Sequence, residues 1–170
     1  MTMDIRDTMA ELTELDFESE DTIDEALIGG FRSFQSAAVA RSYESAFVRY
    51  WQCLEALTLV DPEKDRASVP PQRAGTFLNI TDSQFFDDRL ESLWNKRNQL
   101  VHESEPITIL ESDLNLLKRL ADLTIDELLT FRGEHSVSEA RLIMDRGGED
   151  NETIQDEIQE LEFILDWQSR

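Results

Sequence analysis

The spacing of apolar residues constrains the fold of this chain more than any other feature of its sequence. Between residues 42 and 60, apolar side chains recur at intervals of three, four and seven, which places them on one face of an α-helix. Comparable stripes follow residues 22, 81 and 110, and we find no two-residue alternation typical of a half-buried strand. The sequence therefore predicts an all-α protein. The stripe in 42–60 consists of Phe47, Tyr50, Trp51, Leu54, Leu57 and Thr58.

Capping residues, prolines and glycines indicate where these helices begin and end. Thr22, with Glu25 three residues later, forms a capping-box pattern at the start of the first helix. Residues 61–81 contain three prolines and a glycine, and we expect them to form a long loop before the third helix. Pro106 separates the third helix from a fourth, which should begin near Glu111.

Four amphipathic helices with one long loop predict an antiparallel four-helix bundle over residues 22–132. Residues 1–21 form an acidic N-terminal segment without a clear apolar pattern. Residues 133–170 form a C-terminal helical extension, with helices expected near 138–146 and 152–168. The last helix has apolar residues at near-heptad spacing, and we expect it to dock onto the bundle.

The chain carries a formal net charge of −21, and its acidic residues are spread along the whole sequence. Thirteen arginines stand against three lysines, Lys64, Lys96 and Lys118. This composition resembles that of haloarchaeal proteins, in which surface carboxylates keep the protein hydrated in a salty cytoplasm. At about 1 M salt the Debye length is only about 3 Å, so the negative charge does not exclude a nucleic-acid substrate. An acidic mimic of nucleic acid is the alternative interpretation.

The sequence favours a cytoplasmic location. The N-terminus lacks the basic and apolar regions of a signal peptide, and no apolar run is long enough to span a membrane. The single cysteine, Cys53, cannot form an internal disulfide, and its place in an apolar stripe predicts a core residue.

Arg97 occupies an unusual position in the third helix. If Phe86 is set at zero and each residue advances about 100°, Arg97 falls at about 20°, in the middle of the apolar face. A guanidinium group stays charged and is costly to bury without a partner. Either Arg97 forms a structural ion pair, with Glu55 of the second helix as the candidate partner, or it has a chemical role.

His102 lies five residues after Arg97, at about 160° on the same helical wheel, so an ideal helix would point it away from Arg97. A frayed last turn before Pro106 would allow the imidazole to return towards Arg97. A histidine near a helix end is also commonly a favourable C-terminal cation.

The stretch from Arg97 to His102 resembles the RX4–6H motif of HEPN domains, with Asn98 at the position that is commonly polar in that motif. Residues 47–57, with Trp51, Leu54, Glu55 and Leu57, resemble the W-x-x-L-E-x-L helix of Apea-like HEPN proteins. HEPN domains are four-helix bundles, and the resemblance covers about residues 22–132. It does not explain residues 133–170.

Many HEPN proteins are metal-independent endoribonucleases of toxin–antitoxin, CRISPR-associated or other antiviral defence systems. The resemblance implies that Arg97 stabilises the charge developing on the phosphate and that His102 is the general acid or base. Asn98 would orient His102 or the phosphate, and Glu55 would position Arg97. No metal or cofactor is implied. Arg41, Arg49, Arg73, Arg89 and Lys96 are candidates to line an RNA groove.

The resemblance also implies a homodimer, because HEPN protomers usually meet near the motif and share one cleft. Trp51 and Trp94 are aromatic residues that suit such an interface as well as a core. RNA is the expected substrate, and an antitoxin or a defence-complex protein is a further possible partner. The alternative function is a non-catalytic HEPN module that binds a nucleotide or a protein, and an unrelated helical bundle is the third interpretation.

Overall fold

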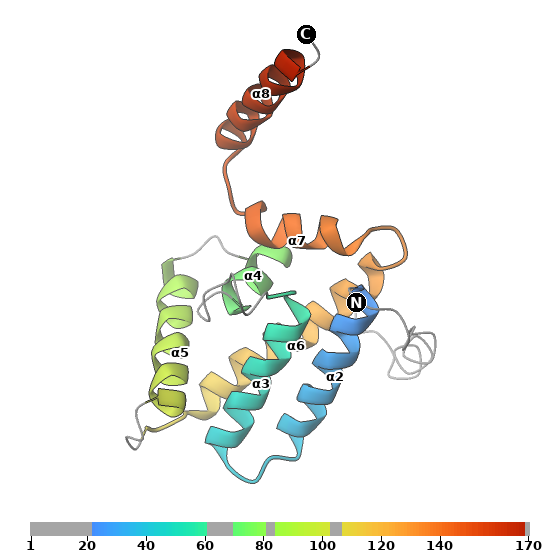
Figure 1. The fold of residues 1–170 in the computed structure, drawn as a ribbon. Coiled ribbons are helices and arrows are strands. Elements are labelled where there is room, and N and C mark those ends of the chain that lie inside the picture. The colour runs from blue at the N-terminus through green and yellow to red at the C-terminus, as the bar shows by residue number, and fades with distance from the viewer. Residues whose placement is uncertain (1–21, 61–69, 81–83, 103–106, 169–170) are drawn as a thin grey trace.

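The structure, a computed structural model, describes residues 22–60, 70–80, 84–102 and 107–168 (Figure 1). All of the regular secondary structure in these ranges is helical, so the prediction of an all-α protein is confirmed. The helices are α2 (Ile23–Ala38), α3 (Tyr43–Leu57), α4 (Pro70–Phe77), α5 (Gln84–His102), α6 (Glu111–Phe131), α7 (Val137–Arg146) and α8 (Asn151–Gln168).

Helices α2 and α3 form an antiparallel hairpin whose ends are fixed by side-chain caps. The hydroxyl of Thr22 accepts a hydrogen bond from the Glu25 N–H at 3.2 Å, as the sequence predicts. Ser42 caps α3 in the same way. A β-carbon at Gly30 would overlap the side chain of Leu57, so any larger residue would have to displace Leu57 where the two helices approach each other.

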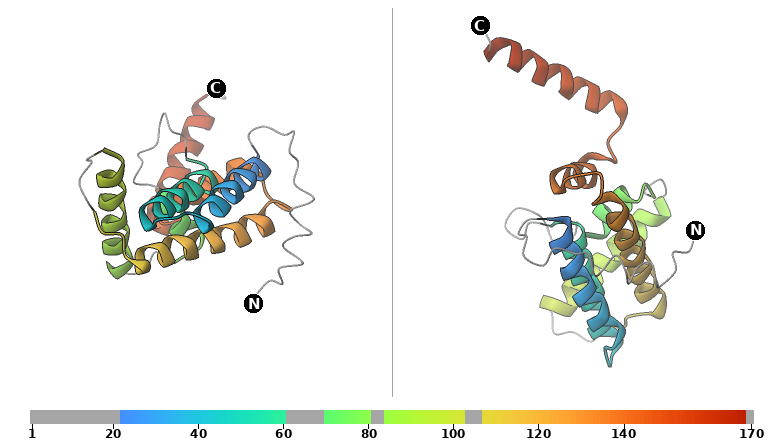
Figure 2. Two further views of the ribbon diagram at one scale, coloured as in Figure 1. Left: turned by 90° about the horizontal axis from the view of Figure 1, so that it is seen from below. Right: turned by 90° about the vertical axis from the view of Figure 1, so that its right-hand side faces the viewer.

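The core lies where α3 packs between α2 and α6, and α5 stands at the side of this group (Figure 2). The apolar stripe of α3 enters the core as predicted, and Cys53 is fully buried within it. Trp51 stacks on Phe47 with ring centroids 6.2 Å apart and lies 6.3 Å from the ring of Trp94 on α5. The largest fully buried apolar side chains are Trp51, Phe47, Leu27, Leu54, Leu57, Leu93, Leu117, Leu120 and Leu128.

Helix α4 lies inside the segment that the sequence analysis expects to be a loop, so that expectation is wrong for residues 70–77. Pro70 and Pro71 occupy the first positions of the helix, where backbone N–H groups have no intrahelical partner and proline is tolerated. Ala74 and Phe77 then enter the core, and α4 packs against α7. Residues 78–80 are non-helical, as expected, and residues 61–69 and 81 lie outside the described residues.

Helix α8 projects away from the other helices (Figure 1), and none of its side chains is buried in the described structure. The expectation that it docks onto the bundle is therefore wrong. Its base is held by an ion pair between Arg146 at the end of α7 and Glu157. Helical periodicity identifies which face of α8 is apolar, but it does not identify what covers that face.

Candidate functional site around Arg97

Arg97 lies on the side of α5 that faces α3, and its surroundings come from both helices. Its Nη2 atom is 3.8 Å from Oε1 of Glu55, so the ion pair suggested by the sequence is present. The guanidinium carbon lies 5.9 Å from the centre of the Trp94 ring, within range of a cation–π contact. Nη1 donates to Oδ1 of Asn98 at 3.5 Å. The Arg97 side chain remains 18% exposed and that of Glu55 33%, so the pair reaches the surface.

Glu55, the carboxylate that pairs with Arg97, has a shifted pKa. Burial raises the pKa of its carboxyl group, and this effect outweighs the opposing influence of Arg97 and of the Trp51 indole. The buried N–H of Trp51 makes no hydrogen bond of normal geometry among the described residues, but it lies near enough to the Glu55 carboxylate to favour its charged form. Arg97 is therefore held by a carboxylate that is itself poorly solvated.

His102 is the last residue of α5, so the helix continues through the whole of the Arg97–His102 stretch. Five residues correspond to about 500°, which leaves the two positions about 140° apart around the helix axis. The side chain of His102 lies outside the described part of the structure. The structure thus brings Arg97, Asn98 and Glu55 together, and it leaves the place of the His102 imidazole open.

Two of the basic residues suggested for an RNA groove are held by one buried acid. Asp113, in the first turn of α6, is fully buried and binds Arg89 Nη2 at 3.1 Å and the Lys96 ammonium group. It also accepts a hydrogen bond from the backbone N–H of Leu110 at 2.9 Å. Burial alone would raise the pKa of Asp113, but the contacts with Lys96, Leu110 and Arg89 lower it. Arg89 and Lys96 therefore connect α5 to α6.

Arg73 on α4 is also committed to the fold. Its side chain is buried, and it forms an ion pair with Asp145 of α7, with Nε 2.8 Å from the carboxylate. Nη1 donates to the backbone carbonyls of Thr58 and Leu59 at the end of α3. Of the other two candidates, Arg49 donates to Gln52 of its own helix, and Arg41 lies in the exposed connection between α2 and α3. The five residues do not form one basic groove.

Asp113 is not among the residues that the sequence indicates, and Arg73, a candidate for an RNA groove, is buried in the structure. With 37 acidic residues in the chain, no single carboxylate stands out from the sequence. The usable signal for Asp113 was its place three residues after Leu110, where a carboxylate can reach back to the N–H that precedes a helix. Arg73 gave no comparable signal, because its partners lie in segments far away along the chain.

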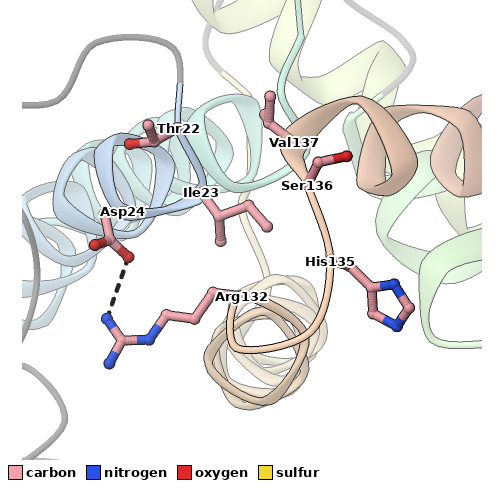
Figure 3. Close-up of a pocket in the computed structure, with 7 residues that line it drawn as sticks. All are labelled: Thr22, Ile23, Asp24, Arg132, His135, Ser136 and Val137. Atoms are coloured by element: carbon pink, nitrogen blue, oxygen red, sulfur yellow. Dashed lines mark hydrogen bonds and ion pairs between the residues drawn. The ribbon is translucent and has the colours of Figure 1, made fainter.

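The other histidine, His135, borders a pocket of about 380 Å³ between the start of α2 and the turn that joins α6 to α7. Figure 3 shows its imidazole pointing away from the ion pair of Asp24 and Arg132, whose atoms are 3.1 Å apart. His135 stacks on Phe131 and approaches Glu139. The charged groups of this pocket are thus directed towards one another and do not converge on a common point.

Two further features are absent from the part of the chain that the structure describes. No group of three or more His, Cys, Asp or Glu side chains is arranged to hold a metal ion. No helix is both long and apolar enough to cross a membrane. Compared with known proteins, the chain matches no family model, no curated protein and no solved structure.

Proposed function

We propose that this protein is a metal-independent endoribonuclease of the HEPN type, in which α2, α3, α5 and α6 within residues 22–132 form the antiparallel four-helix domain and α4 is an additional short helix. The observation that carries the proposal is the setting of Arg97. Its guanidinium lies against Trp94 and 3.8 Å from Glu55, and it retains access to solvent. A cation fixed in this way can bind a phosphate oxygen without first being ordered. A role in toxin–antitoxin or antiviral defence follows from the resemblance alone.

The proposed reaction uses the nucleophile that RNA supplies. The 2′-oxygen attacks the adjacent phosphorus, the bond to the 5′-oxygen breaks, and the products are a 2′,3′-cyclic phosphate and a free 5′-hydroxyl. An imidazole can both accept and donate a proton near neutral pH. His102 either takes the proton of the attacking 2′-hydroxyl or supplies a proton to the leaving 5′-oxygen, and water exchanges the other proton. Arg97 stabilises the charge on the non-bridging oxygens, Glu55 positions Arg97, and Asn98 orients the phosphate or His102.

A second protomer would complete the site. Arg97 and His102 occupy positions about 140° apart on α5, so one scissile phosphate is reached more easily by residues from two chains. Of the two tryptophans suggested for such an interface, Trp51 is buried in the core and is not available. Trp94 is only partly buried and remains a candidate.

The homodimer is tested by light scattering at high salt, where the mass should be twice the chain mass of 19.7 kDa. Replacing Trp94 by Ala should shift the mass towards that of one chain. A single-chain mass for the wild type over a wide concentration range would remove the shared site.

A non-catalytic HEPN module that binds a nucleotide or a protein is the second candidate function. It is favoured by the ion pair of Arg97 with Glu55, which gives Arg97 a structural role, and by the absence of a common basic groove among the five candidate residues. In that case Arg97 and His102 are not required to meet at one phosphate.

The deciding experiment is incubation of labelled RNA with the purified protein at high salt in the presence of EDTA. Wild type should cleave, whereas Arg97→Ala and His102→Ala should each lose cleavage by about 10²–10⁴-fold. The double variant should lose little more than each single variant, since residues that act as a unit are not additive. His135→Ala is the matched control, because it removes the only other histidine, and it should cleave normally. Absence of EDTA-resistant cleavage in the wild type would favour the binding module.

A further inference from the structure

Helix α8 presents a broad apolar face to solvent. With Leu161 as reference on an ideal helix, five apolar residues fall within about 60° on either side of it. Four of them are 41–65% exposed, although apolar side chains of this size are usually buried in a folded protein. Glu157 is the one acid inside this arc, about 40° from Leu161, and it pairs with Arg146. An exposed apolar surface of this width marks a binding surface. The α8 apolar face consists of Ile154, Ile158, Leu161, Ile164 and Leu165.

Acidic residues border this face on both sides. Glu162 lies about 100° to one side of Leu161, and Glu160 about 100° to the other. No lysine or arginine occurs between residues 151 and 168 to balance them. Arg146 of α7 pairs with Glu157 at the base of the helix. The acidic residues of α8 are Glu152, Asp156, Glu157, Glu160, Glu162 and Asp166.

The acidic residues of α8 indicate which kind of molecule can bind the α8 apolar face. A second copy of the chain would bring the same six acids opposite one another, and like charges placed opposite one another across an interface are unfavourable. The rest of the chain offers no better complement, because it also carries a large net negative charge of −15, the −21 of the whole chain less the −6 of α8. A helix or groove with apolar residues in the centre and lysine or arginine at its edges would match both the α8 apolar face and the acidic residues that border it.

We propose that α8 is a docking helix for a different protein, which contributes an apolar helix or groove flanked by basic residues. The Arg146–Glu157 ion pair joins the base of α8 to the end of α7, and α8 projects away from the other helices (Figure 1), which leaves its apolar face exposed. The proposal goes beyond the cleavage of RNA and does not rest on it.

The test uses the full chain and two synthetic amphipathic peptides of about three heptads each, with leucine and isoleucine at the a and d positions. One peptide carries lysine at the e and g positions, and the other carries glutamate. Binding is followed by fluorescence anisotropy of the labelled peptide. We expect the lysine peptide to bind at least about tenfold more tightly than the glutamate peptide, a difference of about 1.4 kcal/mol. Raising the salt concentration should narrow that difference, because salt screens the charges.

Two variants locate the binding surface. Leu161→Asp places a charge in the middle of the α8 apolar face and should weaken binding of the lysine peptide by about tenfold or more. Gln159→Asp adds the same charge about 160° away on the exposed helix and should leave binding unchanged. Replacing both Glu160 and Glu162 by Gln should reduce the preference for the lysine peptide.

Three results would overturn the proposal. They are equal binding of the two peptides, no binding of either, and a dimer mass that falls to one chain in Leu161→Asp, since the last would assign the face to a second copy. RNA cleavage is read out separately. Leu161→Asp should cleave as the wild type does, so failure of the docking proposal is distinguishable from failure of the nuclease proposal.

Discussion

Asp113 joins two cations of α5 to the first turn of α6, and its carboxylate is fully buried. Asp113→Asn keeps the shape of the side chain but removes its charge, which leaves Arg89 and Lys96 without their partner. We expect the free energy of unfolding to fall by about 2–3 kcal/mol in urea denaturation. Asp122→Asn is the control, because Asp122 pairs with Lys118 on the surface of α6, and it should cost less than about 0.5 kcal/mol.

The same residue makes stability depend on pH in a defined direction. Since the pKa of Asp113 is lower in the folded than in the unfolded chain, folding favours its charged form. The stabilisation is complete above the unfolded value of about 3.9 and is lost as the pH falls through the folded pKa. The difference in unfolding free energy between wild type and Asp113→Asn should therefore shrink below about pH 4. A constant difference across the acid range would contradict this assignment.

Arg97 and Glu55 form a partly exposed ion pair. Removing that ion pair should therefore lower the free energy of unfolding only modestly. We expect Arg97→Ala to lower the free energy of unfolding by about 1–2 kcal/mol, from the exposed ion pair and the cation–π contact with Trp94. The variant should thus remain folded, and a loss of RNA cleavage would not reflect unfolding. Removing the guanidinium should also raise the pKa of Glu55 further, because the burial effect would then be less opposed. Carboxyl NMR titration measures that change.

At the scale of single residues, the sequence indicates Arg97 and Glu55 because a permanent cation in an apolar stripe needs an explanation. Helical geometry is enough to place Arg97 opposite the helix that carries Glu55. Geometry alone is not enough for Arg73, because its bonds depend on how α3, α4 and α7 come together.

At the scale of elements, α4 is joined to α7 and to the end of α3 through the side chain of Arg73. Arg73→Met keeps much of the apolar length of the side chain but removes the bonds to Asp145, Thr58 and Leu59. We expect a loss of about 2–3 kcal/mol, because the Thr58 carbonyl lies in the protein interior. Amide hydrogen exchange should increase over residues 137–146 more than over residues 43–57. Arg49→Met, at an exposed position of α3, should leave both segments unchanged.

The same scale shows what local sequence signals can and cannot predict. Long apolar stripes, as in α2, α3 and α6, identify helices because most of their stability comes from one buried face, and side-chain caps mark the starts of α2 and α3. These signals do not identify helix α4, because its prolines and glycine are also the residues typical of a loop. For α8 the pattern predicts the helix correctly, but not its exposure, which depends on what it contacts.

At the scale of the whole molecule, a net charge of −21 on 170 residues opposes the compact state through self-repulsion. Raising the KCl concentration from about 0.1 M to about 1 M shortens the Debye length from about 10 Å to about 3 Å. We therefore expect the thermal midpoint, followed by circular dichroism, to rise over this range. A midpoint that does not depend on salt would argue against adaptation to a salty cytoplasm.

The buried thiol of Cys53 can report how often the core of this protein opens. The cysteine is fully enclosed, and burial, with a smaller contribution from Asp122, raises its pKa to about 12. The thiolate is the reactive form, so alkylating reagents cannot modify the chain at neutral pH until α3 separates from its neighbours. Because the chain has no other cysteine, the rate of cysteine alkylation reports the opening of this one core without an engineered reporter residue.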